Sequence, residues 1–300
     1  MIARILTSAP MGQTARPEVL APDATSRPIL WLNLLCLDAP LVAVAWQWVF
    51  ARSAHITTTP AQVGALFLTA WLIYLVDRLA DSIWLPTNVA PAARKAFCAA
   101  HRSVWMGAIA AIALADLAIV GRWLDGATLS NGIFLGLIAG VYLVTNVLFG
   151  RVWRMIPIKE IVIGILFATG TLLVLVESPA TPSWSIVLAA SFFAALCFLN
   201  CISIAVWERD LDQARGQSSI ATRWPRIGVS IPFASFGLTV IACILAIADH
   251  SVLAPAICIG LSAALLAALH FVPSNRDQRT ALADLVLLTP LFFLILERTW

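Results

Sequence analysis

Most of this chain consists of apolar stretches that are long enough to cross a lipid bilayer. Nine of them follow one another from residue 29 onward, and most are close to the ~20 residues that span a ~30 Å hydrocarbon core. They lack the alternation of polar and apolar residues that membrane strands show, so each is predicted to be a helix. The nine predicted transmembrane helices cover residues 29–50, 61–83, 103–121, 129–149, 158–177, 183–207, 227–248, 252–272 and 280–297.

The composition excludes several classes of protein. Apolar residues make up 61% of the 300 residues and charged residues 12%, against about 45–50% and about 25% in ordinary globular chains. This predicts an all-α integral membrane protein and excludes a secreted disulfide scaffold or a nucleic-acid binder. The six cysteines form no CxxC pair and the four histidines are scattered, so neither a zinc site nor a haem site is predicted.

The chain divides into a short tail and one membrane domain. Residues 1–28 are polar and interrupted by prolines, and they are predicted to form a flexible tail without a cleavable signal peptide. Residues 29–300 are predicted to form a single nine-helix transmembrane domain.

The basic residues predict the orientation of the chain. All but three of the 19 Lys and Arg residues fall in the tail or in every second loop; the exceptions are Arg52, Arg122 and Arg298. The positive-inside rule places those segments in the cytoplasm and the C-terminus on the opposite side. The predicted location is therefore a cell inner membrane, crossed many times, with a cap of long cytoplasmic loops that carries the functional residues.

Two short acidic motifs lie at the ends of the second and sixth predicted helices. Asp77 and Asp81 are four residues apart, and so are Glu208 and Asp212. On a helix this spacing stacks two carboxylates on one face, where they repel unless a cation lies between them. Paired carboxylates together with substrate phosphates are the usual protein ligands of Mg²⁺, although acidic helix ends are often merely solvated.

The two motifs share the order acidic residue, Arg, two residues, Asp, and four helices separate the two copies. This repetition predicts a single bundle built from two related four-helix units with one helix added.

This arrangement resembles the UbiA superfamily of intramembrane prenyltransferases. Its members usually show NDxxDxxxD in the first motif and DxxDxxxD in the second, and the matching stretches here end at Asp81 and Asp212. In that alignment Tyr74 and Ala205 stand at positions where the family has polar motif residues. Lys159, at the start of the fifth predicted helix, resembles the basic residue that the family has there.

The resemblance implies Mg²⁺-dependent transfer of a prenyl group from a prenyl diphosphate to an aromatic or other lipophilic acceptor inside the membrane. It implies that the metal-binding and catalytic residues are Asp77, Asp81, Glu208 and Asp212. The candidate phosphate-binding residues are Lys159, Arg94 and Arg215, whose alternative role is positive-inside anchoring. The remaining candidates for substrate binding are Tyr74, which can face an allylic cation, and the polar residues Asn200 and Asp38, which can also serve helix packing.

Three other functions fit the same sequence features. A membrane terpene cyclase would keep the fold and let the allylic cation react internally. A secondary transporter would bind its substrate at broken helices near the membrane midplane. A membrane scaffold would have no catalytic site. The expected partners are a prenyl diphosphate, a lipophilic acceptor and membrane lipid, and no nucleic acid.

Overall fold

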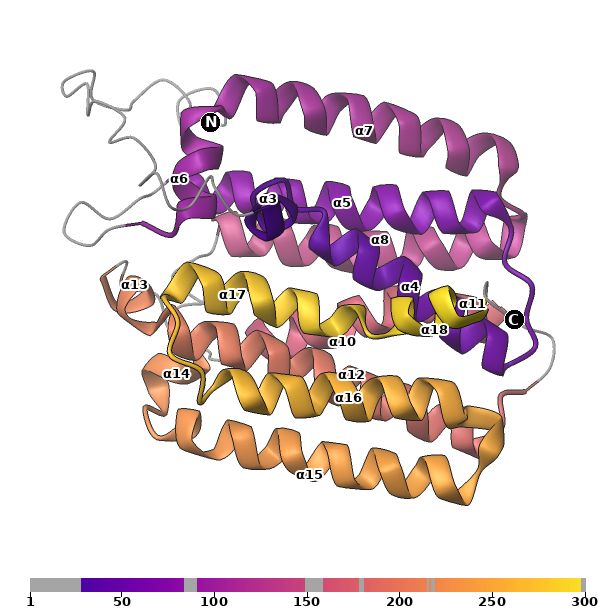
Figure 1. Ribbon diagram of the computed structural model, residues 1–300. Coiled ribbons are helices and arrows are strands. Elements are labelled where there is room, and N and C mark those ends of the chain that lie inside the picture. Colours follow the sequence, from indigo (N-terminus) through magenta and orange to yellow (C-terminus); the bar gives the residue numbers. More distant parts are fainter. Residues whose placement is uncertain are drawn as a thin grey trace, which may run out of the picture.

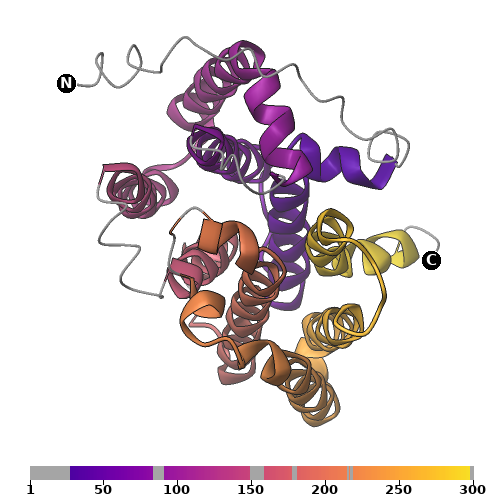
Figure 2. The same cartoon turned by 90° about the vertical axis from the view of Figure 1, so that its left-hand side faces the viewer.

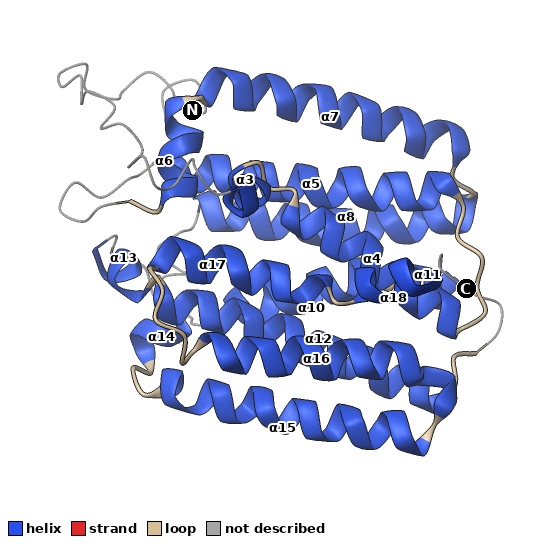
Figure 3. Ribbon diagram, in the orientation of Figure 1, coloured by secondary structure: helices blue, strands red, loops and turns tan. Residues whose placement is uncertain are grey.

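The fold is a single bundle of helices that run side by side (Figure 1). The structure is a computed structural model, and it describes residues 28–83, 91–148, 159–177, 181–214, 216 and 219–297. Helices make up all the regular structure of these residues, which contain no strand (Figure 3). Residues 1–27, nearly the whole predicted tail, lie outside the described residues.

Six helices in the described part of the chain are long and apolar enough to cross a membrane. This confirms the prediction of an all-α, multi-pass membrane protein. They are α5 (Pro60–Ser82), α7 (Arg102–Trp123), α8 (Gly126–Leu148), α12 (Trp184–Trp207), α15 (Ile227–Ala248) and α16 (Leu253–Leu269), which η1 (His250–Val252) precedes.

The other three predicted helices are interrupted, so the prediction of continuous helices was wrong at those places. Residues 29–50 correspond to α3 (Pro28–Leu34) and α4 (Asp38–Ser53). Residues 158–177 correspond to α10 (Lys159–Thr171) and α11 (Leu173–Glu177), and residues 280–297 to the end of α17 (Arg276–Leu285), η2 (Val286–Leu288) and α18 (Pro290–Glu297).

Two of these breaks have a local cause. Cys36 has a φ of 56°, a left-handed conformation that reverses the helical path between α3 and α4. Pro290 is the first residue of α18, and a proline there cannot donate the hydrogen bond that would continue the preceding turn.

Helix α4 lies in the middle of the bundle, as the end view in Figure 2 shows. Its Trp46 and Phe50 are fully buried, as is Phe193 of α12. The Trp46 and Phe193 rings stack with centroids 4.4 Å apart, and the Trp46 indole N–H donates to the carbonyl of Leu287 at 2.8 Å. That bond satisfies the indole in the core and a carbonyl at the helix break, so it fixes α4 against the last helices.

Three of the short helices lie at one end of the bundle, where α5 and α12 finish (Figure 1). They are α6 (Ala93–Ala100), α13 (Arg209–Ala214) and α14 (Ile220–Arg223), and α3 and the start of α17 lie at the same end. Because the two acidic motifs end α5 and α12, this end carries the candidate site.

Candidate functional site

The two acidic motifs meet at a lysine from the loop region between α5 and α7. Lys95 lies in the first turn of α6 and is 5% exposed. Its Nζ is 3.1 Å from Asp81 Oδ2 of the first motif and 3.4 Å from Glu208 Oε2 of the second. The structure therefore brings Asp81 and Glu208 together around one cation.

Arg94 completes this ion-pair cluster. It is buried, and its Nη2 donates to Glu208 Oε1, the second oxygen of the carboxylate that Lys95 contacts. Both oxygens of Glu208 thus have basic partners. Pro91 and the extended Ala92 precede α6, so the helix begins where its first turn can present Arg94 and Lys95 to the end of α12.

Electrostatics keep Glu208 ionised. Burial raises its pKa, but the nearby Arg94, Lys95 and Arg78 outweigh that effect and hold the pKa at about 2. The carboxylate is therefore negative at any physiological pH.

Arg78 is a site residue that the sequence analysis did not select. It lies between Asp77 and Asp81 on α5, is 4% exposed, and places its guanidinium carbon 5.1 Å from the centroid of the Tyr74 ring. Its Nε has no hydrogen-bond partner within the described residues. Tyr74 was predicted to face a substrate cation, and in this structure its ring lies next to the Arg78 cation.

The remaining carboxylates of the motifs flank the cluster. Asp77 is half-buried and Asp212 is buried, and both have interaction partners. The Asp212 N–H donates to the Glu208 carbonyl at 3.0 Å, which keeps the two motif residues on successive turns.

Carboxylate oxygens are the ligands that Mg²⁺ prefers, so the donor set of the two motifs fits that ion chemically. In the described part of the chain, no three His, Cys, Asp or Glu side chains gather closely enough to hold a metal together. The cation that lies between the two motifs here is the Lys95 ammonium.

Asp38 and Asn200 lie in a second polar group beneath the ion pairs. Asn33 of α3 donates through Nδ2 to Asp38 Oδ2 at 2.6 Å and to Asp284 Oδ2 at 3.2 Å. Asn200 of α12 donates through Nδ2 to Asp284 Oδ1 at 3.1 Å. All four residues are buried, so the structure joins two predicted site residues to two, Asn33 and Asp284, that were not selected.

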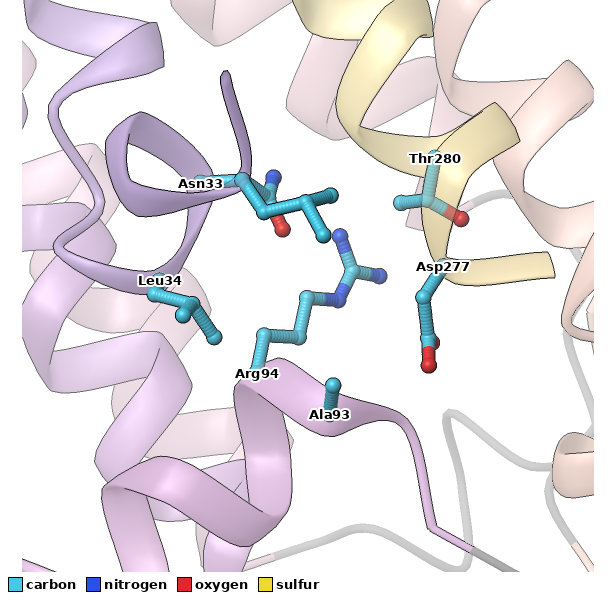
Figure 4. Close-up of a pocket in the computed structure, with 7 residues that line it drawn as sticks. Asn33, Leu34, Ala93, Arg94, Asp277 and Thr280 are labelled. Atoms are coloured by element: carbon cyan, nitrogen blue, oxygen red, sulfur yellow. The ribbon is translucent and has the colours of Figure 1, made fainter. Parts of the chain in front are cut away.

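A small pocket connects this group with the ion pairs. Its lining residues come from α3, α6 and α17, and they are Leu30, Asn33, Leu34, Ala93, Arg94, Asp277 and Thr280. Figure 4 shows the Arg94 side chain extending between Asn33 and Thr280. A ligand in this pocket would contact the guanidinium of Arg94 and the amide of Asn33.

Two predicted phosphate-binding residues cannot be placed in the site. Lys159 opens α10, but its side chain lies outside the described residues, and so does all of Arg215. The neighbouring Glu160 is described; it is 2% exposed, and its Oε1 accepts from the Ile220 N–H at 3.4 Å. This carboxylate binds the start of α14 and is not a surface group.

Comparisons of the chain with family models, with curated proteins and with solved structures give no match. The chemistry of the site therefore carries the functional argument.

Proposed function

We propose that this protein is an intramembrane prenyltransferase of the UbiA type. It would transfer a prenyl group from a prenyl diphosphate to an aromatic or other lipophilic acceptor. The observation that carries the proposal is the position of Lys95, which contacts Asp81 of the first acidic motif and Glu208 of the second.

The buried cations suit a polyanionic leaving group. Arg78, Arg94 and Lys95 are each less than 8% exposed and lie among the two acidic motifs. Basic groups in a water-poor site stabilise developing charge on phosphate oxygens far better than they would in water. Because Glu208 and Asp81 already orient Arg94 and Lys95, these cations need little reorganisation when the diphosphate leaves.

The acidic motifs are the proposed ligands of Mg²⁺, through Asp77, Asp81, Glu208 and Asp212. When bound there, the metal supplies further positive charge to the leaving diphosphate. The motif carboxylates would then have two roles. They balance the charge of the buried basic residues, and they provide the hard oxygen ligands that Mg²⁺ requires.

The proposal includes the finer topology. The interrupted helices α3–α4, α10–α11 and α17–α18 would bring the number of membrane crossings to nine. The membrane would be a cell inner membrane. The end of the bundle that carries the site would face the cytoplasm, because the basic residues gather at that end.

The direct test is incubation of the purified protein, in lipid nanodiscs, with labelled prenyl diphosphates, Mg²⁺ and phenolic acceptors. Transfer of label to an acceptor supports the proposal. A cyclic hydrocarbon product would instead support a terpene cyclase, and full recovery of the diphosphate would reject both and leave transport or a scaffold role.

Removal of a motif carboxylate should abolish turnover. Asp77→Ala and Asp212→Ala are each expected to lower the transfer rate by at least about 10²-fold, the effect of losing one stabilising group for transition-state charge. The exposed Asp210, from the same acidic stretch as Asp212, provides the control: Asp210→Ala should keep the wild-type rate. Near-normal turnover of both motif variants at limiting Mg²⁺ would contradict their role.

Lys159→Met tests the predicted phosphate contact at the start of α10. A helix N-terminus favours anions through its free N–H groups, and a lysine there adds a mobile charge. We expect the variant to have a KM for prenyl diphosphate raised about tenfold, with an unchanged melting temperature. Wild-type kinetics would remove Lys159 from the site.

A further inference from the structure

One ammonium group joins the two acidic motifs in this structure. Lys95 Nζ lies 3.1 Å from Asp81 Oδ2, at the end of α5, and 3.4 Å from Glu208 Oε2, at the end of α12. Asp81 and Glu208 belong to different motifs on different helices, and two carboxylates that approach one another repel unless a cation lies between them. The positive charge that holds the two motifs together is thus part of the protein.

Helix α6 is fixed on three sides, so the position of Lys95 does not depend on its ion pairs alone. Arg276 of α17 donates through Nη2 to the carbonyl of Pro91, just before α6, at 3.2 Å. The Phe97 ring of α6 meets the Trp31 ring of α3 edge-on, with centroids 5.9 Å apart, and α6 packs along α5. The fold itself therefore places the ammonium between the two carboxylates.

The Lys95 ammonium has a donor left for a ligand. A lysine ammonium carries three N–H donors, and among the described residues Asp81 and Glu208 are its only partners. The side chain of Asp81 is 25% exposed, whereas those of Lys95 and Glu208 are 6% and 7% exposed. The Asp81 side of the bridge is therefore the side that is open to a solute.

A divalent ion between the same two carboxylates would compete with this ammonium. Mg²⁺ binds carboxylate oxygens at about 2.0–2.1 Å, so an ion that bridged Asp81 and Glu208 would lie beside Lys95 Nζ. Two like charges that close repel strongly in a water-poor site. Arg94, which contacts the other oxygen of Glu208, adds to the repulsion. The two motifs can thus hold one cation between them at low cost, and the fold supplies it.

We propose that the Lys95 ammonium takes the place of a divalent ion between the two motifs and donates its third N–H to the diphosphate of the substrate. The first part stands on the geometry of the ion pairs, and the second rests on the proposed function. When the bond from C1 of the prenyl group to the diphosphate oxygen breaks, its electron pair stays on the diphosphate. Lys95 stabilises that charge through a hydrogen bond and keeps its proton. Mg²⁺ would then bind within a motif and not between the two.

Manganese binding tests the bridge without any turnover. Mn²⁺ takes the same oxygen ligands as Mg²⁺, and its electron paramagnetic resonance signal measures the bound fraction. In lipid nanodiscs, Lys95→Met should bind Mn²⁺ at least about tenfold more tightly than the wild type, the lower end of the effect that one neighbouring charge has on the affinity of a carboxylate for a proton. If a melting curve shows that Lys95→Met does not fold, Lys95→Gln replaces it, because its amide still donates to both carboxylates.

Arg94→Met is the matched control. It removes a buried positive charge from the same carboxylate, Glu208, but leaves the ammonium between the two motifs. Its Mn²⁺ affinity should therefore stay below that of Lys95→Met. Equal gains in the two variants would reflect a general loss of positive charge and would overturn the proposal.

Inorganic diphosphate tests the third donor. With EDTA present, so that no divalent ion contributes, titration calorimetry should show that the wild type binds diphosphate at least about tenfold more tightly than Lys95→Met, the value of one hydrogen bond to a charged group. Adding Mn²⁺ should restore diphosphate binding in the variant, because an ion then occupies the place that Lys95 has left.

The outcomes separate this inference from the proposed function. A Lys95→Met variant that binds Mn²⁺ like the wild type would overturn the bridge role, and one that binds diphosphate like the wild type in EDTA would overturn the role of the third donor. A wild type that transfers no prenyl group, beside a variant that gains Mn²⁺ affinity, would reject the proposed function and support the bridge. A wild type that transfers prenyl groups, beside a variant without that gain, would reject the inference alone.

Discussion

Glu208→Gln is expected to destabilise the protein by about 3–5 kcal/mol, the cost of removing one partner from a buried ion pair. Arg94 and Lys95 both contact this carboxylate and are almost fully buried. Glutamine keeps the shape of the side chain but leaves the two cations with one fewer negative charge in a water-poor environment. Reversible unfolding in a mild detergent measures the change in free energy.

Two controls make the Glu208 result specific. Asp277 forms a half-exposed ion pair with Arg276 at 3.6 Å, and Asp277→Asn should cost less than about 1 kcal/mol because solvent screens such pairs. Adding Arg94→Met to Glu208→Gln should recover part of the lost stability by removing an unpaired charge. If Glu208→Gln proves as mild as Asp277→Asn, the cluster is not a buried network.

The pH dependence of stability follows from the same residue. The pKa of Glu208 in the fold is about 2, below its ordinary value near 4.3. The stabilisation from its charge is therefore complete above about pH 4.5 and falls as the pH drops toward 2. In Glu208→Gln this acidic loss should be smaller.

Arg78→Met is expected to lower the transfer rate by about 10²–10³-fold with little change in acceptor affinity. Arg78 is buried beside both acidic motifs and has an Nε without a partner in the described residues, so its charge is available to a leaving diphosphate. Loss of one such donor has an effect of this size in other enzymes. Single-turnover kinetics with labelled prenyl diphosphate measure it.

Arg122 offers a matched control because its guanidinium carbon also lies over an aromatic ring, 5.8 Å from the centroid of Trp123. It lies in the last turn of α7, which finishes at the other end of the bundle from α6 (Figure 1). Arg122→Met should transfer at the wild-type rate. A wild-type rate in Arg78→Met would assign Arg78 to charge balance of the acidic motifs alone.

Hydropathy was enough to locate the long helices, because α5, α7, α12 and α15 begin and end within a few residues of the predicted stretches. It missed the interruptions since an apolar count is insensitive to backbone conformation. The residue types around Cys36 do not predict its positive φ. Proline favours the first position of a helix, and α18 begins at Pro290.

The acidic motifs were visible in the sequence because their spacing is local, whereas their partners are distant. Arg94 and Lys95 lie 114 and 113 residues from Glu208, and no local sequence pattern predicts an ion pair over that separation. Lys95 was counted with the other basic loop residues, and Arg78 was noted only as the Arg of the first motif, because its local spacing does not indicate that it is buried. The link from Asn33 to Asp284 spans 251 residues and depends wholly on the packing of α3 against α17.

The central position of α4 has a consequence for the order in which the bundle is assembled during synthesis. This segment is made early in synthesis, yet Trp46 bonds to a carbonyl 241 residues later in the chain. At ~5–20 residues per second, the ribosome reaches that partner on the order of 10–50 s afterwards. During that interval α4, with its buried Asp38 and Gln47, lacks the contacts that α16, α17 and α18 make with it in the finished fold. The helix at the centre of the bundle is thus among the first to be made and gains its last neighbours only when synthesis is nearly complete.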